Sequence, residues 1–280
     1  MQEKWYCRWA PSLGGGFAGT PEECWGVEKY NPDLHLNENV VFCGLYGLPD
    51  FYALWKHKGR KAIWWAGSDI RHFINGYWLD DKGEIRFAPR SLAEWIIKNC
   101  ESWVENKAEY DALKKFGIKS KMVPSFLGDV NKFKPQKLNK ELRYYSSVSG
   151  NDFKLYGWDK INKIAKKNPH ITYYLYGNTI PWKAPKNVIV RGRMSQNEMD
   201  EEIKTMTGAI CMVKFSGASE IVIKSILYGQ TPITLIEYPY DRNKLLRIVN
   251  RYPWNLNVSK MPKLSKRVYY LSKPNKKREK

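Results

Sequence analysis

The sequence predicts an α/β protein made of two consecutive domains, each built on a parallel sheet. Short apolar runs of strand length alternate with longer segments of helical period, and this alternation occurs twice. Between the two halves, residues 128–141 form a polar, charged stretch with a proline, which indicates a linker. The chain has 280 residues, of which 43% are hydrophobic, so two domains with cores of their own fit its length.

The first half is expected to form an N-terminal domain, assigned to residues 1–136. Strands are expected at residues 40–43, 62–65, 102–104 and 121–123, and helices at residues 49–58, 92–98 and 107–116. Ser91 precedes the second helix and Glu94 follows three residues later, which is the pattern of a capping box. The third helix is expected to stop at Gly117.

The second half, residues 137–280, is expected to form a C-terminal domain of the same kind. Strands are expected at residues 142–148, 171–176, 188–190, 209–213 and 232–236, and helices at residues 157–167, after Ser195, and at 219–228. Ser195 and Glu198 again fit a capping box. Open α/β sheets bind ligands at the carboxyl ends of their strands, so a ligand-binding cleft between the two domains is expected.

The charge of the chain points to anionic partners. Lys and Arg number 47 against 28 Asp and Glu, which gives a formal net charge of +19, and such a surface attracts nucleic acid, anionic lipid or phosphorylated molecules. Part of the excess is local, because residues 260–280 carry many basic residues and one acidic residue, Glu279. This tail is either a solvated segment or a contact for an anionic membrane surface or nucleic acid.

Several classes of protein are excluded. No stretch approaches the ~18 apolar residues of a spanning helix, and residues 1–9 lack an apolar signal region. We therefore expect a soluble, cytoplasmic protein that can be peripheral at the membrane. The cysteines form no Cys-x-x-Cys pair, which favours buried free thiols over disulfides or a metal site. They are Cys7, Cys24, Cys43, Cys100 and Cys211.

The most informative segment runs from Lys214 to Thr234, where a small-residue loop leads from a strand into a helix. Gly217 and Ala218 let the backbone approach a ligand, and Ser219 can cap the helix. The N–H groups and the dipole at a helix N-terminus favour a phosphate there. The same residues are also compatible with a simple strand-to-helix turn.

This segment resembles the donor site of glycosyltransferase family 4. Residues 105–118 and 123–135, Tyr156-Gly-Trp-Asp, Leu175-Tyr-Gly and residues 187–199 resemble further parts of that family in the correct order. The resemblance covers residues 100–240 well and residues 1–100 loosely. It implies a GT-B fold, in which two Rossmann-like domains face each other across a cleft. A nucleotide-sugar would bind mainly to the second domain and the acceptor to the first, with no obligatory metal and no other cofactor.

Carried over residue by residue, the resemblance implies a donor site. Lys154 would act in catalysis, because a fixed cation stabilises the charge that develops on the leaving diphosphate, although it can equally be a surface lysine. The other donor-binding residues would be Gly150 and Asn151 near the pyrophosphate, Gly177, Asn178, Gly192 and Arg193 near the nucleoside, and Ser216, Gly217, Ala218 and Ser219 in the phosphate turn.

In the first domain the glycine-rich turn Gly14, Gly15 and Gly16 falls where the family has its acceptor-side loop. Trp64-Trp-Ala-Gly-Ser-Asp-Ile-Arg-His resembles the family's His-Gly-Ser/Thr-Asp segment, but its histidine position is Ala66. Asp69 and His72 thus become the nearest catalytic candidates. A purely structural role for His72 is an equal alternative.

The sequence departs from the family at its paired glutamates, which fall on Ser216 and Lys224. The second glutamate usually holds the ribose of the donor, and a lysine cannot accept hydrogen bonds from ribose hydroxyls. Glu220, which lies between the two positions, could substitute as a catalytic carboxylate or simply complement the helix dipole.

We therefore predict a hexosyltransferase-like enzyme that moves a sugar from a nucleotide-sugar to a glycan or lipid-linked acceptor, with the retaining stereochemistry of the resembled family. Two alternatives stay open. One is a glycosyltransferase that modifies nucleic acid, the less favoured partner, since a charge of +19 also suits a phosphate backbone. The other is a degenerate GT-B protein that binds a phosphorylated ligand without turnover.

Overall fold

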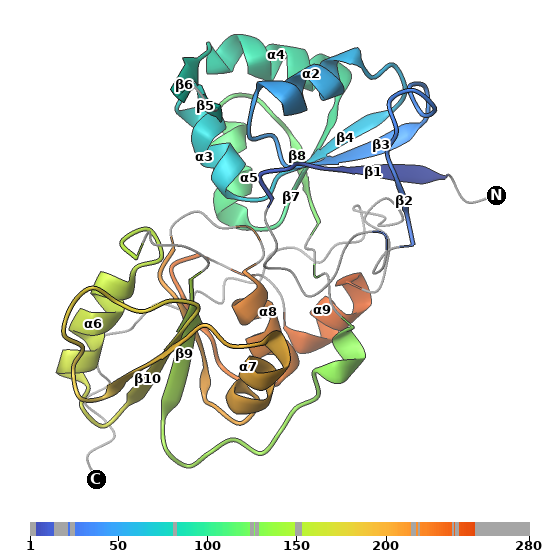
Figure 1. The fold of residues 1–280 in the computed structure, drawn as a ribbon. Helices are drawn as coiled ribbons and strands as arrows, with labels where there is room; N and C mark the ends of the chain where they lie inside the picture. The colour runs from blue at the N-terminus through green and yellow to red at the C-terminus, as the bar shows by residue number, and fades with distance from the viewer. Residues whose placement is uncertain are drawn as a thin grey trace. The chain divides into compact units, whose positions relative to one another are not determined.

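The computed structural model describes residues 4–13, 22, 26–80, 83–123, 126, 129–148, 153–213, 217, 219–236, 238 and 241–249 (Figure 1). It divides into two compact units, the first containing Met1–Asp129 and Gly217, the second containing Val130–Lys214 and Ser219–Leu245. Several predicted features lie outside the described residues. They are Gly14, Gly15, Gly16, Cys24, Gly150, Asn151, Ser216, Ala218 and the basic tail.

The first unit is built on a six-stranded sheet in which all neighbouring strands are parallel. Its strand order is β2 (Glu28–Lys29), β1 (Trp5–Trp9), β3 (Asn39–Cys43), β4 (Lys61–Trp64), β7 (Glu101–Val104) and β8 (Ser120–Met122). Among the described residues of this unit the structure gives the helices α2 (Leu48–Lys56), α3 (Ser68–Ile74), α4 (Pro89–Asn99) and α5 (Lys107–Lys114). Side chains from each of these helices join one face of the sheet in a single core that includes Val40, Phe42 and Ile63.

The other face of this sheet is buried as well. Val41, Cys43, Trp64 and Trp103 form a second core with Leu13 and other residues that lie outside the helices. Strands that are buried on both faces appear in sequence as continuous apolar runs, which is why 40–43 and 62–65 could be predicted within one residue of the observed strands.

The structure corrects one prediction for this unit and adds elements that the sequence analysis missed. The capping box of Ser91 and Glu94 is wrong, because α4 begins at Pro89 after the N-cap Ala88, so Ser91 is already helical. Proline favours the first helical position, where its missing N–H costs nothing. The missed elements are β1, β2, α3 and an antiparallel hairpin of β5 (Tyr77–Asp80) and β6 (Gly83–Arg86).

The second unit contains a five-stranded parallel sheet with the order β11-β10-β9-β12-β13. The strands are β9 (Arg143–Ser147), β10 (Thr172–Tyr176), β11 (Val188–Gly192), β12 (Gly208–Cys211) and β13 (Ile233–Thr234). The helices are η1 (Val130–Lys132), α6 (Trp158–Lys167), α7 (Gln196–Ile203) and α8 (Glu220–Leu227). α9 (Arg242–Val249) begins in this unit, and its residues from Leu246 onward belong to the first unit. The two parallel α/β sheets confirm the predicted fold class.

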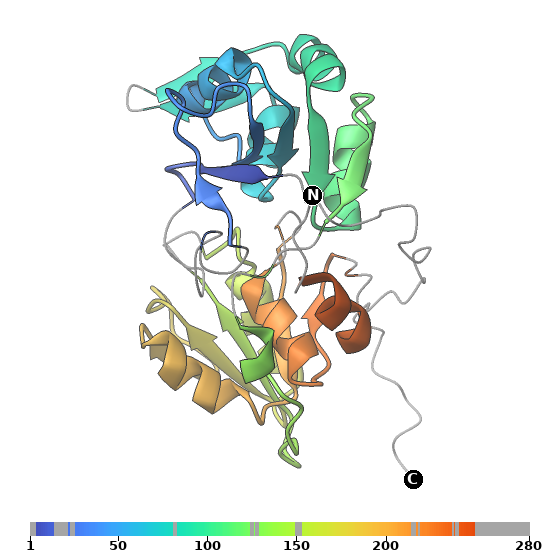
Figure 2. The same ribbon diagram turned by 90° about the vertical axis from the view of Figure 1, so that its right-hand side faces the viewer.

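Local contacts in the second unit follow the sequence closely. The Ser195–Glu198 capping box is confirmed, since the Glu198 carboxylate accepts the Ser195 N–H at 2.9 Å and the Ser195 hydroxyl accepts the Glu198 N–H at 3.3 Å. α8 lies next to the start of α9 (Figures 1 and 2), where Arg242 Nε donates to the Leu227 carbonyl at 2.8 Å.

The described cysteines are all free thiols. Cys7, Cys43 and Cys211 are buried free thiols and Cys100 is half-buried. Within the described ranges, no helix is long and apolar enough to cross a membrane. Those ranges also contain no group of three or more His, Cys, Asp or Glu side chains arranged to hold a metal ion.

Candidate functional site

The strand order of the second unit creates a topological switch point. From β9 the chain continues to β10 and β11 on one side and then returns to β12 on the other side of β9. The loops after β9 and β12 therefore diverge at the carboxyl edge of the sheet, which is where open α/β folds bind ligands. These two loops lead into α6 and α8, so two helix N-termini begin at this edge.

Glycine allows the strand ends β9, β10 and β11 to meet closely. Gly177, just after β10, has a φ of +98°, and a Cβ atom there would lie 1.9 Å from the Val148 carbonyl oxygen. Its N–H donates to the Gly192 carbonyl at 2.7 Å. Arg193 Nε in turn donates to the Gly177 carbonyl at 3.2 Å, which fixes one side of an otherwise exposed guanidinium. The structure thus brings together three of the residues predicted for the nucleoside side.

The start of α6 packs against the end of β12. Gly157, the N-cap of α6, has a φ of +71°, and a Cβ atom there would lie 2.4 Å from the Cβ of Met212. Lys154 lies in the turn before this glycine, is exposed, and accepts the Gly157 N–H with its carbonyl at 3.1 Å. Its ammonium is therefore available at the N-terminus of α6.

α8 begins with Ser219 as its N-cap, as predicted, but the Ser219 side chain makes no capping hydrogen bond. The Ser219 N–H instead donates to the Tyr238 hydroxyl at 3.4 Å. Glu220 follows as the first helical residue, and burial raises the pKa of its carboxyl although Lys224 opposes this shift.

Lys224 lies one helical turn after Glu220 in α8 and carries a buried positive charge. Its side chain is 1% exposed, and its ammonium lies 2.8 Å from Asp200 Oδ1 and 3.0 Å from Glu220 Oε1. It also lies 5.4 Å from the centre of the Phe133 ring. Lys224 is thus buried between two carboxylates, and Glu220 is engaged as its partner. The sequence analysis missed Asp200, which contributes from α7.

In the first unit, Asp69 holds two strand-end loops together. Its fully buried carboxylate accepts the N–H groups of Leu45, Ala66 and Ile70 at 3.0, 3.1 and 2.8 Å. Burial raises the pKa of Asp69 to about 6, while these backbone hydrogen bonds lower it. Asp69 therefore connects the loop that follows β3 with the loop that follows β4 through these hydrogen bonds.

His72 occupies the same helix as Asp69, but no hydrogen bond joins the two. The imidazole is buried, its Nδ1 has no hydrogen-bond partner among the described residues, and burial lowers its pKa. The ring packs against Tyr77 at 4.8 Å between centroids. His72 is therefore a neutral side chain beside Asp69 near neutral pH.

A buried acidic pair after β7 is the main feature that sequence reasoning missed. Glu105 is 4% exposed and Glu109 is fully buried. Glu109 Oε2 accepts the Glu105 N–H at 2.7 Å, and its own N–H donates to Asn106 Oδ1 at 3.1 Å. Burial and then the charge of Glu105 raise the pKa of Glu109 well above its usual range. Glu105 directly after the apolar strand and Glu109 four residues later were the signal that could have identified this pair.

Gly217 belongs to the first unit by its surroundings. A Cβ atom at this position would lie 2.1 Å from Glu105 Oε2 and 3.3 Å from the Ala66 carbonyl oxygen. The described neighbours of Gly217 are thus the strand-end loops of Glu105 and Ala66, and its approach to a ligand stays a prediction.

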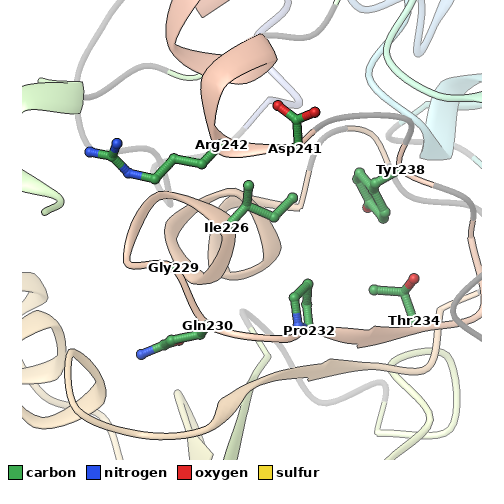
Figure 3. A pocket seen from close by; sticks show the side chains of 8 residues that line it. All are labelled: Ile226, Gly229, Gln230, Pro232, Thr234, Tyr238, Asp241 and Arg242. Carbon is green, nitrogen blue, oxygen red and sulfur yellow. The ribbon is translucent and has the colours of Figure 1, made fainter. Parts of the chain in front are cut away.

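The second unit also holds a separate cavity of about 190 Å³ beside α8. Figure 3 shows that its lining comes from the C-terminal end of α8, from the segment through β13 and from the start of α9. Gln230 in its wall already has both ends of its amide engaged, since Oε1 accepts from Tyr145 at 2.9 Å and Nε2 donates to the Ile203 carbonyl at 2.7 Å. None of the predicted site residues lines this cavity.

No protein-family model and no curated protein matches the sequence. Solved structures do match. Sucrose-phosphate synthase from Thermosynechococcus elongatus aligns with a TM-score of 0.50 and 11% identity over 75% of this chain and 63% of that one. TarM aligns with a TM-score of 0.49 and 13% identity over 76% of this chain and 48% of that one. A trehalose 6-phosphate synthase from Burkholderia multivorans aligns with a TM-score of 0.48 and 7% identity over 92% of this chain and 90% of that one.

This chain thus spans about half of the TarM structure and less than two thirds of the sucrose-phosphate synthase structure. At these identities the similarity concerns the fold alone. Together with the two parallel sheets it shows that the fold is GT-B, made of two Rossmann-like units.

Proposed function

We propose that the protein is a nucleotide-sugar-dependent glycosyltransferase that resembles family 4 and acts with retention. The observation that carries this proposal is the switch point between β9 and β12 on a GT-B fold, with the N-termini of α6 and α8 at the same edge. Helix N-termini and small-residue turns suit the diphosphate of a nucleotide-sugar. The order of the family-like segments in the sequence supports the same assignment.

The residues at this edge would work by positioning and by charge. The exposed ammonium of Lys154 would stabilise the diphosphate as the sugar bond breaks, and the anchored guanidinium of Arg193 would contact the donor beside Gly177. The first unit would present the acceptor, with Asp69 and His72 near its strand-end loops. No obligatory metal is part of this proposal, so activity should persist in a chelator.

The acceptor is proposed to be a glycan or a lipid-linked saccharide, and the protein to work in the cytoplasm or peripherally at the membrane. A second candidate function has an observation of its own. Lys224 is buried between Asp200 and Glu220, so the residue that replaces the family's ribose-binding glutamate does not offer an acceptor group to a donor. This favours a GT-B protein that binds a phosphorylated ligand without turnover as the alternative.

The test is a thermal-shift panel of nucleotide-sugars followed by a hydrolysis assay on each donor that binds. We expect one class of donor to raise the Tm and to release its sugar. Lys154→Gln and Arg193→Gln should weaken both effects, whereas Lys163→Gln, an exposed lysine on α6, is the matched control. Binding without sugar release across all donors would favour the non-catalytic alternative, and no binding by any donor would refute both.

A further inference from the structure

Helix α2 is apolar on two opposite sides. Leu54 is fully buried in the core of the first unit, and Phe51 packs against the same core. On the outer side, Leu48, Tyr52 and Trp55 are 46%, 52% and 55% exposed. Their spacing of four and three residues places them on one stripe of the helix. A surface helix normally presents polar residues outward, so this stripe is unexpected for a helix in contact with water only.

Neighbouring residues extend the stripe. Tyr52 and Trp55 stack on each other with centroids 6.1 Å apart and an interplanar angle of 27°. The hairpin lies beside α2, since the Phe51 and Trp78 rings are 5.5 Å apart and a Cβ atom at Gly47, the N-cap of α2, would lie 3.5 Å from the Leu79 carbonyl oxygen. Leu79 is 55% exposed. We call Leu48, Tyr52, Trp55 and Leu79 the apolar face.

A basic hollow of about 580 Å³ adjoins the apolar face at Trp55. Lys56, Lys58 and Lys61 contribute to its lining, and none of its lining residues is acidic. Lys56 and Lys58 are exposed, with the Lys56 ammonium 4.4 Å from the centre of the Tyr52 ring. Lys61 is buried, and its ammonium donates to the carbonyl oxygens of Leu54 and His57 at the end of α2. The hollow therefore offers positive charge beside exposed apolar side chains.

We propose that the apolar face docks on an anionic phospholipid bilayer, with a lipid phosphate near Lys56 and Lys58. Tyr and Trp favour the membrane interface, leucines favour its acyl boundary, and lysines beside them reach the headgroups. The aliphatic side chains at one end of the stripe distinguish a bilayer from a nucleic acid, which offers bases for stacking but no apolar layer for Leu48 and Leu79. This inference rests on the peripheral membrane location in the proposed function and names the surface that would dock, while its test needs neither donor nor acceptor.

The experiment is vesicle co-sedimentation of the full chain with phosphatidylglycerol-containing vesicles and with phosphatidylcholine vesicles. We expect binding to the anionic vesicles only, weakened when salt is raised from about 0.1 M to about 1 M. Lys56→Gln with Lys58→Gln should bind about thirtyfold more weakly, the equivalent of about 1 kcal/mol for each lysine near an anionic surface. Tyr52→Ser with Trp55→Ser should weaken vesicle binding by at least about tenfold.

Two matched controls separate this face from general charge and hydrophobicity. Lys163→Gln with Lys166→Gln removes two exposed lysines from α6, and Ile97→Ser removes a side chain that is 50% exposed on α4. Both controls should bind vesicles like the unchanged chain. Equal loss in the controls, unchanged binding in both face variants, or a change of oligomeric state in the Tyr52 and Trp55 variant in place of lost vesicle binding would overturn the proposal.

Discussion

Replacement of Lys224 by methionine should destabilise the second unit strongly. The change removes an ammonium that is 1% exposed and leaves Asp200 and Glu220, 18% and 17% exposed, without their shared counter-charge. Loss of one partner from a buried ion pair costs about 3–5 kcal/mol. Because both carboxylates keep some contact with water and Glu220 already has a raised pKa, we expect the lower end, a loss of about 3 kcal/mol in the free energy of unfolding.

Urea denaturation followed by circular dichroism measures this loss. Adding Asp200→Asn and Glu220→Gln to Lys224→Met should recover most of it, because the triple variant leaves no buried charge unpaired. Lys204→Met is the control, since Lys204 pairs with the exposed Glu201 and should cost less than about 1 kcal/mol. A loss from Lys224→Met no larger than the control, or no recovery in the triple variant, would refute the reasoning.

Three further predictions concern single positions. Gly177→Ala should cost about 3 kcal/mol or more, because its φ is +98° and a Cβ would meet a carbonyl oxygen at 1.9 Å, whereas Gly192→Ala, with a φ of +68° and open space, should cost only about 1–2 kcal/mol. Chemical denaturation measures both, and equal losses would contradict the packing argument. Asp69 has a pKa raised to about 6, so the folded state binds its proton more tightly than the unfolded state does, and stability should fall by about 3 kcal/mol as pH rises from about 4 to about 6. Asp69→Asn should remove this part of the pH dependence, and an unchanged profile would count against it. Gly217→Val should raise the donor Kd about tenfold or more without unfolding the protein, because its side chain would block the approach of the backbone to the donor. The Cβ would also lie 2.1 Å from the buried Glu105 Oε2, so the Tm should fall. Titration calorimetry that finds the same Kd would remove Gly217 from the site.

The central strands of the first sheet could be predicted because they are buried on both faces. The apolar runs that end at Cys43, Trp65 and Val104 stand out from their surroundings, and each lies within one residue of an observed strand. The missed hairpin has the opposite character, since Glu84 and Arg86 make β6 largely exposed and remove the apolar run. The missed α3 has only seven residues and begins after Gly67 with a φ of +91°, so its helical period is too short to detect.

The candidate site could be predicted in position but not in detail. Loops at strand ends can be placed once the strands are known, and Gly177, Gly192 and Arg193 do come together. The sequence gives no comparable signal for contacts between side chains of different helices or strands. Asp200 lies 24 residues before Lys224, and no local pattern shows that it would meet this lysine.

The ion pair between Lys224 and Glu220 affects how the proposed donor site would attract a phosphate. Glu220 is the first residue of α8, so its negative charge would repel a diphosphate at the N-terminus of that helix. The Lys224 ammonium at 3.0 Å compensates this charge from within the protein, while Lys154 is exposed at the neighbouring helix N-terminus. On the proposed function, a lysine in place of the ribose-binding glutamate would therefore preserve the attraction of the site for phosphate, and the cost would fall on recognition of the ribose.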